Sequence, residues 1–406
     1  MSCQSAVYEW TAAVTSKLPH LSKPQAAVLV MWSLGMVLAR SCALSAVSTF
    51  LASGLGHKEN TVRQQLREWC YDACDKRGAK RRDLDVEGCF VPLLRWVLNR
   101  WEGTQLAVAL DATTLGSLFV VLAISVVYRG CAIPVAWTIL PATEKHAWRE
   151  EWLRMLAQFK GVVPAHYTVI VLADRGLYAR WLFRAIVDLH WHPFLRINAG
   201  GTFHPEDKGR FYPLSSFAPT VGSRWSGNGI AFKAADSRLK CTLLACWEEG
   251  YKEQWFILTD LPPEASQACW YGLRAWIEQG FKITKRAGWQ WQRTKMTDPK
   301  RAARLWLAVA VATLWLLSVG GVADETIPTS TLWDVTAALA QQKRQRAATR
   351  LRLVSVFRRG LARILAALIN QAPLPVGIFI PEPWPKLPPI PLQTHTHLRA
   401  MQDAAA

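Results

Sequence analysis

The sequence of 406 residues has little of several features that define particular protein classes. Its nine cysteines form no Cys-x-x-Cys pair and have no histidines at zinc-ligand spacing, and the N-terminus does not resemble a signal peptide. These absences speak against a disulfide-stapled secreted domain and against a zinc module. We therefore expect the protein to reside in a reducing cytoplasm, with its thiols serving as small core residues.

Long apolar runs are also scarce. The longest, Leu305–Val319, has 15 residues, fewer than the roughly 20 that a helix needs to cross a bilayer. A helix buried against a sheet explains this run better, and a cationic membrane-associated protein is kept as an alternative. The shorter run Ala26–Leu38, which follows Pro24, is predicted to be another buried helix.

Acidic residues are few relative to basic ones. The chain has 30 Asp and Glu against 48 Lys and Arg, a net charge of +18 and a pI near 9.8. This excess predicts a polyanionic partner, either nucleic acid or an anionic membrane surface. Because 51% of the residues are hydrophobic, we expect a packed core, and the length allows two or three domains.

Three of the acids stand out by their position. Gln105–Asp111 and Tyr167–Asp174 are apolar runs rich in strand-forming residues, and each ends in an aspartate. Because an unpaired buried carboxylate is costly, each aspartate should lie at the exposed carboxyl end of a strand. Glu278 follows on a predicted helix. Gathered carboxylates repel one another unless a divalent cation neutralises them, and magnesium suits such oxygen ligands.

The stretch around Glu278 carries a second pattern. Tyr271, Arg274, Glu278 and Lys285 stand at offsets 0, 3, 7 and 14, which places them on one stripe of an α-helix. A face with an acid flanked by bases suits the binding of a polyanion together with a metal ion. The alternative is a solvated helix with ion pairs such as Glu278 with Lys282.

The three acids, with this spacing of Tyr, Arg, Glu and Lys around the last, resemble the catalytic triad and the Y-R-E-K signature of DDE transposases, specifically the insertion-sequence family four type. The likeness covers roughly residues 105–318. It implies that Asp111, Asp174 and Glu278 are catalytic and hold two Mg²⁺ ions, with Mn²⁺ able to substitute. It also implies that the Tyr, Arg and Lys of the signature hold the DNA phosphate beside the cut. The segment Trp255–Thr259 resembles a family motif whose Trp stacks on a base flipped from the transposon end.

The resemblance also implies an activity and partners. The activity is Mg-dependent cleavage at the terminal inverted repeats of a mobile element, followed by strand transfer into target DNA. The route is cut and paste, through hairpin ends if Trp255 acts as described. The implied partners are double-stranded DNA and a second copy of the chain in a synaptic homodimer, with no membrane. The implied location is the nucleoid in a bacterial cytoplasm.

The order of predicted elements agrees with this family. Three strands between Leu106 and Leu140 should form an antiparallel meander, followed by a helix, the strand ending at Asp174 and another helix, which is the RNase H order. The expected fold is α/β, with an RNase H-like mixed sheet flanked by helices, a β-rich insertion before the Glu helix and a helical N-terminal domain. The expected domains are 1–100 (helical, DNA-binding), 101–190 (first part of the catalytic core), 191–263 (β-rich insertion), 264–320 (second part of the core), 321–370 (basic helical) and 371–406 (Pro-rich tail).

Several basic segments are candidates for DNA contact. Residues 45–69 have the form helix, Gly-containing turn, helix, with Asn60 or Thr61 as the N-cap of the second helix and Arg63 and Arg67 directed at DNA. The alternative is an ordinary helical hairpin with a solvated basic face. A basic cluster at 76–82 and the aromatic-basic stretch 286–297, with Lys295, are interpreted as phosphate contacts. Residues 341–363 predict a basic amphipathic helix, and residues 373–391 predict an extended, mobile tail.

Two other functions are kept as alternatives to the transposase. One is a catalytically inactive or domesticated sequence-specific DNA-binding protein, against which the three intact acids count. The other is a non-transposing RNase H-like nuclease, which would cut DNA without joining ends.

Overall fold

The computed structural model describes residues 3–78, 82–144, 148–324 and 354–386. The chain divides into two compact units. Of the described residues, the first unit comprises those within 3–168, 276–324 and 354–382, and the second comprises those within 169–275 and 383–386. The expected finer division into six domains stays a prediction. In the basic segment 341–363, residues up to 353 lie outside the described part, as do residues 79–81 of the basic cluster.

The first hundred residues of the first unit are helical, as expected. The helices are α1 (Cys3–Lys17), α2 (Lys23–Ala39), α3 (Leu44–Leu55), α4 (Glu59–Trp69) and α5 (Phe90–Leu98). Ser22 begins α2 with a capping box, since its hydroxyl accepts from the Gln25 N–H while the Gln25 side chain accepts from the Ser22 N–H. Pro24 stands in the first turn, where a missing N–H costs nothing. The predicted buried helix at 26–38 is thereby confirmed.

Helices α3 and α4 form the predicted helix-turn-helix. Gly56 ends α3 in the left-handed conformation, with φ +67°, and its N–H donates to the Ala52 carbonyl. Helix α4 buries Val62, Leu66 and Trp69, which recur at helical spacing. The predicted cap was wrong: the N-cap is Lys58, without a side-chain hydrogen bond, so neither Asn60 nor Thr61 caps the helix.

Three antiparallel strands form the sheet of the first unit, in the order β3-β2-β1. They are β1 (Gln105–Leu115), β2 (Phe119–Tyr128) and β3 (Cys131–Pro141). Arg129 and Gly130, both at positive φ, make the two-residue turn between β2 and β3 that the sequence predicted. A bulge follows where Ser125 pairs with Pro134, because a proline has no N–H to donate to the ladder.

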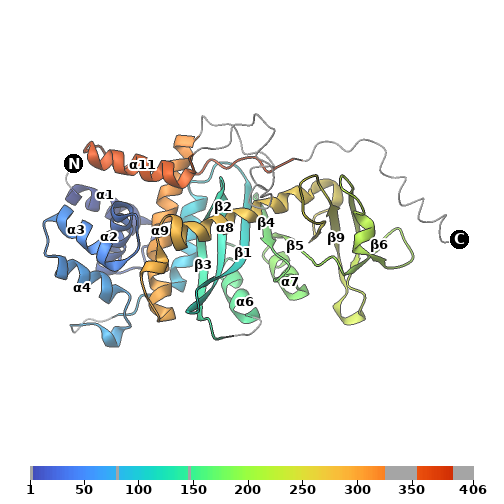
Figure 1. Cartoon of the computed structure of the whole chain (residues 1–406), viewed down its shortest axis with the longest axis horizontal. Coiled ribbons are helices and arrows are strands. Elements are labelled where there is room, and N and C mark those ends of the chain that lie inside the picture. Colours follow the sequence, from blue (N-terminus) through green and yellow to red (C-terminus); the bar gives the residue numbers. More distant parts are fainter. Residues whose placement is uncertain (1–2, 79–81, 145–147, 325–353, 387–406) are drawn as a thin grey trace. The chain divides into compact units, whose positions relative to one another are not determined.

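Helix α9 (Pro299–Asp324) is the core helix of the first unit and contains the longest apolar run. It packs against α2, β3 and α11 (Val356–Ile369), as Figure 1 shows for α9 in orange beside β3. The Trp137 indole on β3 donates to the Ala303 carbonyl at 3.0 Å. Among the described residues α9 is the one single helix long and apolar enough to span a membrane, but 94% of its apolar window is buried in the protein. Helices α2 and α3 pass the same test only as a pair bent by 95°.

Residues 372–382 form an extended strap along the first unit. Backbone hydrogen bonds join Phe379 to Arg100 and Glu102, at 2.7 and 2.8 Å, and the Arg129 Nε donates to the Ile380 carbonyl at 2.7 Å. Phe379 is fully buried. The segment is extended, as predicted, but it is bound to the unit, which corrects the expectation of mobility for this part of the tail. Residues 387–391 lie outside the described part.

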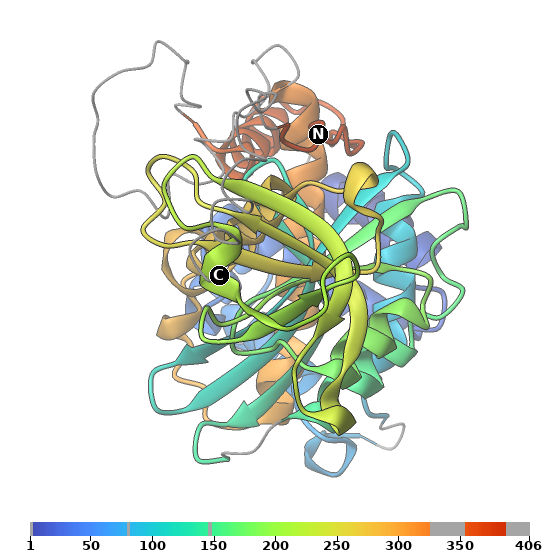
Figure 2. The same cartoon turned by 90° about the vertical axis from the view of Figure 1, so that its right-hand side faces the viewer.

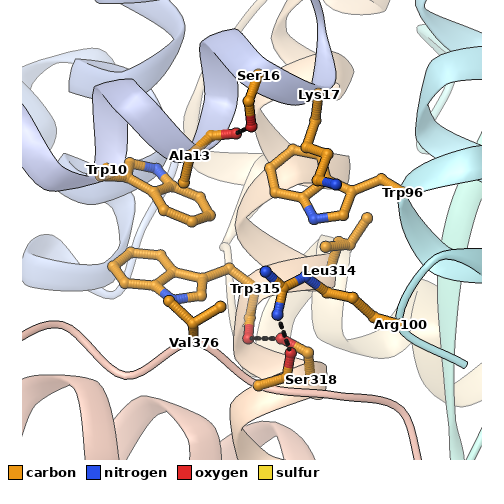
Figure 3. Close-up of a pocket in the computed structure, with 11 residues that line it drawn as sticks. Trp10, Ala13, Ser16, Lys17, Trp96, Arg100, Leu314, Trp315, Ser318 and Val376 are labelled. Atoms are coloured by element: carbon orange, nitrogen blue, oxygen red, sulfur yellow. Dashed lines mark hydrogen bonds between the residues drawn. The ribbon is translucent and has the colours of Figure 1, made fainter.

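A small pocket lies where the strap, α1, α5 and α9 meet. Its volume is about 40 Å³, close to the space that one water occupies. Trp10 and Trp315 stack at 4.1 Å on one side, and the Arg100 guanidinium donates to the Gly377 carbonyl on the other (Figure 3). The pocket is therefore a packing feature of the N-terminal helices rather than a site of substrate size.

The second unit begins with a parallel pair. Strand β4 (Thr168–Ala173) is followed by α7 (Arg180–Val187) and β5 (His192–Arg196), which pairs parallel with β4 from Ile170 to Ala173. A helical crossover is the usual connection between parallel strands. Helix α6 (Arg149–Ala157) precedes β4 in the chain. The chain order is thus three antiparallel strands, helix, strand, helix and parallel strand, which is the predicted RNase H-like order.

The remaining strands of the second unit are antiparallel (Figure 2). The sheet order is β4-β5-β10-β9-β8-β6-β7, with β6 (Thr202–Pro205), β7 (Tyr212–Pro213), β8 (Arg224–Ala231), β9 (Leu239–Cys246) and β10 (Trp255–Thr259). These strands are the β-rich insertion expected before the Glu helix. The fold class is therefore α/β with a mixed RNase H-like sheet and flanking helices, as predicted.

Candidate active site

Asp111 lies on β1 at the point where burial stops. Leu106 to Leu110 are buried, whereas Asp111, Ala112 and Thr113 are half-buried. The strand continues to Leu115, paired throughout with β2, so the aspartate stands inside the strand rather than at its end. Its Oδ1 accepts from the Ala112 N–H at 2.9 Å. The buried run before Asp111 is confirmed, but the aspartate is half-buried and lies within the strand, which corrects the predicted exposed strand end.

Asp174 directly follows β4, which is buried from Val169 to Ala173. Its backbone carbonyl accepts from the Leu177 N–H at 3.0 Å, and its Oδ1 accepts from the Gly176 N–H at 2.8 Å. This is an Asx turn, which fixes the orientation of the carboxylate. A Cβ on Gly176 would stand 3.2 Å from Asp174 Oδ1, so the loop leaves little room for a side chain there. The sequence analysis overlooked Gly176, although the Asp-x-Gly pattern is typical of such turns.

The signature segment is not one regular α-helix. Its first part is the 3₁₀-helix η6 (Ala268–Arg274), its middle is α8 (Ala275–Lys282), and its end is the π-helix η7 (Ile283–Ala287). The predicted single stripe is therefore wrong in detail, because the three helix types turn by different angles per residue. The boundary between the two units falls at Ala275 and Trp276, inside this segment.

The Tyr and Arg of the signature belong to the second unit, with Asp174. The Arg274 Nη2 donates to Asp174 Oδ2 at 3.1 Å, with the arginine side chain 13% and the aspartate side chain 40% exposed. Tyr271 lies three residues earlier, almost aligned with Arg274 in a 3₁₀-helix. It is buried, with its ring edge-on to Trp255 at 5.2 Å and Arg196 over it at 5.9 Å. Tyr271 is therefore an anchor of η6, and this placement does not expose it for DNA contact.

The Glu and Lys of the signature belong to the first unit, with Asp111. Glu278 is half-buried in the first turn of α8. Two residues on, a Cβ at Gly280 would stand 2.9 Å from Ala132 Cβ, so the glycine lets α8 approach the start of β3 closely. Lys285 reaches β1, where its Nζ donates to Thr113 Oγ1 at 2.8 Å and to the Thr114 carbonyl at 3.2 Å.

The surroundings of Lys285 shift its pKa. Burial, and then the positive charge of Arg286, lower the pKa of Lys285 below its ordinary 10.5, while the nearby Asp111 acts in the opposite direction. The lysine and the aspartate are thus close enough to interact electrostatically. Of the two basic residues of the signature, Arg274 is thus paired with Asp174, and Lys285 is bonded to the strand that carries Asp111.

Trp255 lies in the hydrophobic core of the second unit. It stands on β10 opposite Cys246 and is 3% exposed. The Tyr251 ring lies 4.3 Å from its ring, tilted by 31°, and the Arg196 guanidinium lies 5.6 Å away over its ring. Arg196 is in turn paired with Glu253 at 3.0 Å. The Trp255 ring is covered in this DNA-free conformation, so the expected stacking role stays a prediction.

The other predicted DNA contacts fall into two groups. Arg63 and Arg67 on α4 and Lys295 before α9 are exposed, as a phosphate contact requires. Arg67 also donates to Gln64 Oε1 and lies 5.9 Å from the Tyr71 ring. By contrast, Trp289 and Trp291 in the aromatic-basic stretch are fully buried. The tryptophans there are core residues, whereas Arg286, Arg293 and Lys295 are exposed.

The donor chemistry of the acids fits a hard divalent cation. Carboxylate oxygens are the ligands that Mg²⁺ prefers, and the Arg274 guanidinium already places positive charge on Asp174 Oδ2. Across the described ranges no group of three or more His, Cys, Asp or Glu side chains is arranged to hold a metal ion. Asp111 and Glu278 belong to one unit and Asp174 to the other.

Comparisons with known proteins bear on this arrangement. Residues 140–315 match the family model described as the transposase DDE domain. A search of curated proteins found no match. Among solved structures the chain is similar to a piggyBac transposase in a synaptic complex with hairpin DNA, at 10% identity and a TM-score of 0.34, over 92% of this chain and 83% of that chain. This likeness is too distant to bear on function.

The fold and the acids at the ends of buried runs define an α/β protein with RNase H-like element order. Residues 140–315 of this chain are therefore similar to a transposase DDE domain. The matched range contains Asp174, Glu278 and the whole signature, while Asp111 precedes it. Members of this family act on DNA in transposition and generally use divalent metal ions.

Proposed function

We propose that the protein cleaves DNA at the terminal inverted repeats of a mobile element and transfers the freed strand into target DNA, as a transposase of the insertion-sequence family four type. The observation that supports this most is the division of the Y-R-E-K signature. Its Arg274 is bonded to Asp174 at 3.1 Å, and its Lys285 is bonded at 2.8 Å to Thr113, two residues beyond Asp111. A signature with one base on an aspartate and the other on the strand that carries the second aspartate suits a site in which acids hold metal and bases hold phosphate.

In the proposed reaction Asp111, Asp174 and Glu278 hold the metal ions. Two Mg²⁺ ions bound there would activate water, and later the 3′-hydroxyl, and would stabilise the departing 3′ oxygen. The side chains themselves position the scissile phosphate. Lys285 and Arg274 neutralise its charge, and the Asx turn at Gly176 orients the Asp174 carboxylate.

DNA binding away from the cut is assigned to exposed basic residues. Helix α4 presents Arg63 and Arg67 opposite its buried face, so the helix-turn-helix would read or hold the terminal repeat. Lys295 precedes α9 and would contact the backbone. A homodimer on two element ends follows from the family resemblance. The hairpin route is not part of this proposal, because it depends on a Trp255 ring that is covered.

The test is cleavage and joining of a labelled duplex that carries the element's own terminal repeat. The wild type is compared with Asp111→Asn, Asp174→Asn and Glu278→Gln, in Mg²⁺ and in EDTA. We expect metal-dependent cleavage at the repeat boundary and joining to a target plasmid, both lost in each variant while repeat binding persists. Tight binding without cleavage by the wild type would support the inactive DNA-binding protein instead. Cleavage without joining would support the non-transposing nuclease.

A further inference from the structure

The ion pair between Arg274 and Asp174 occupies the carboxylate that the proposed function assigns to metal. Both carboxylate oxygens of Asp174 already accept a hydrogen bond, Oδ1 from the Gly176 N–H at 2.8 Å and Oδ2 from Arg274 at 3.1 Å. The first bond is local to the loop and fixes the carboxylate. The second comes from a residue 100 positions later in the chain. A cation that approaches Oδ2 is therefore opposed by the positive charge of the guanidinium.

Arg274 is held in place to make this contact. It ends η6, and Tyr271, one 3₁₀ turn earlier, is buried against Trp255. The neighbouring arginines are engaged elsewhere, since Arg175 and Arg196 both pair with Glu253 at 3.0 Å. The ion pair with Asp174 is thus made by the signature arginine, Arg274, and not by its neighbours Arg175 and Arg196.

A DNA phosphate and the Asp174 carboxylate compete for the Arg274 guanidinium. The guanidinium pairs with Asp174 through Nη2 and its side chain is 13% exposed, so a DNA phosphate that engages it draws it from the carboxylate. Asp174 is 40% exposed, so solvent and ions reach it. DNA phosphate and metal ion are therefore linked through this one side chain, the phosphate by taking Arg274 and the metal by taking Asp174.

We infer that Arg274 stands in for the metal at Asp174 in the DNA-free protein, and that DNA phosphate releases Asp174 for metal binding by taking over the guanidinium. This inference rests on the proposed function, which makes Asp174 a metal ligand. It gives the transposase a safeguard, because the carboxylate is available to metal only when DNA is in the site. Thermodynamic linkage requires the converse as well, namely that metal strengthens DNA binding through the same residue.

The test measures Mn²⁺ affinity directly, by electron paramagnetic resonance on the whole protein without DNA. We expect Arg274→Gln to bind Mn²⁺ more tightly than the wild type, within the 5- to 150-fold range typical of coupled sites. Arg175→Gln is the matched control, since it removes the same charge one residue from Asp174 but pairs with Glu253. It should leave the Mn²⁺ affinity within about twofold. Arg274→Lys keeps a positive charge at this position and should bind Mn²⁺ with nearly the affinity of the wild type. It controls for a folding defect caused by the loss of the arginine.

A second arm of the test adds DNA. A short duplex should tighten Mn²⁺ binding to the wild-type protein and should have no such effect on Arg274→Gln, with Asp174→Asn reporting the Mn²⁺ that binds elsewhere or to DNA. Equal Mn²⁺ affinity of wild type and Arg274→Gln, with or without duplex, would overturn the inference even if cleavage were metal-dependent. If Asp174→Asn neither lowers Mn²⁺ affinity nor stops cleavage, the proposed function itself fails.

Discussion

The Lys285 Nζ donates a 2.8 Å hydrogen bond to Thr113 Oγ1, two residues beyond Asp111 on β1. The end of the signature is thereby attached to the strand that carries the first acid. Arg274 makes the corresponding attachment to the second acid. The four signature residues therefore form two pairs, Tyr271 with Arg274 and Glu278 with Lys285.

The first prediction concerns pH. Because burial lowers the pKa of Lys285 below 10.5, the folded protein loses this proton at a lower pH than the unfolded chain. The contribution of Lys285 to the free energy of unfolding therefore rises with pH between its folded and its unfolded pKa. That contribution is lost as the pH falls through the folded pKa. DNA affinity follows the opposite course, because only the protonated lysine attracts phosphate.

Affinity for a short duplex, measured by fluorescence anisotropy at constant ionic strength from pH 7 to 10, should therefore decline at the alkaline end in the wild type. Lys285→Arg keeps its charge throughout this range and should not show that decline. Lys285→Met should bind weakly at every pH. If wild type and Lys285→Arg lost affinity in parallel, another group would be responsible.

The second prediction concerns the Asx turn. Gly176→Ala places a Cβ 3.2 Å from Asp174 Oδ1 and should rotate the carboxylate. We expect cleavage to fall by about 10- to 100-fold, since small displacements at a reacting centre have effects of this size. The unfolding midpoint should hardly change. Gly200→Ala, in the same unit and with open space around its Cβ position, is the control and should cleave normally.

The third prediction concerns Trp255. Its burial against Tyr251 and Arg196 predicts that Trp255→Ala destabilises the protein by about 3–5 kcal/mol, the usual cost of truncating a large core aromatic. Urea unfolding measures this loss, and Trp255→Phe should recover part of it. A Trp255→Ala protein that is fully stable yet fails only in forming hairpin ends would restore the base-stacking role and contradict this assignment.

The fourth prediction concerns the charges at the end of α9. Asp324 is fully buried, with Oδ2 3.3 Å from Arg129 Nη1 and Oδ1 3.0 Å from Arg359 Nε. Asp324→Asn leaves positive charge in a buried cluster, which typically costs about 3–5 kcal/mol. Thermal unfolding should show a clear loss, whereas Asp188→Asn, at an exposed C-cap, should be almost neutral. Equal stability of Asp324→Asn and wild type would show that the cluster is not stabilising.

Much of the fold could be predicted because it depends on local patterns. Alternating and continuous apolar runs marked β1 to β4, and the Arg129-Gly130 pair marked the hairpin, since few residues adopt positive φ. The run at 305–319 was identified as a core helix by its length alone. The acids could be found for the same reason, because a carboxylate after a buried run must lie where burial ends.

Other features depended on contacts between distant residues. The surroundings of Trp255 come from Tyr251, Arg196 and Tyr271, which no sequence spacing brings together. The strap at 372–382 is held by partners more than 250 residues earlier, such as Arg129 and Tyr128. Its prolines predicted extension correctly, but only tertiary hydrogen bonds decide whether an extended chain is bound.

The sequence by itself determined which residues are proposed to carry the chemistry, namely three acids and two bases at family spacing in a basic chain. The tertiary structure alone decided how they are paired. It bends the signature through 3₁₀, α and π geometry, so that Arg274 reaches Asp174 and Lys285 reaches β1 beside Asp111. Residue spacing alone predicts a regular α-helix here. The change of helix type could not be predicted from it, because that change is imposed by packing between residues far apart in the sequence.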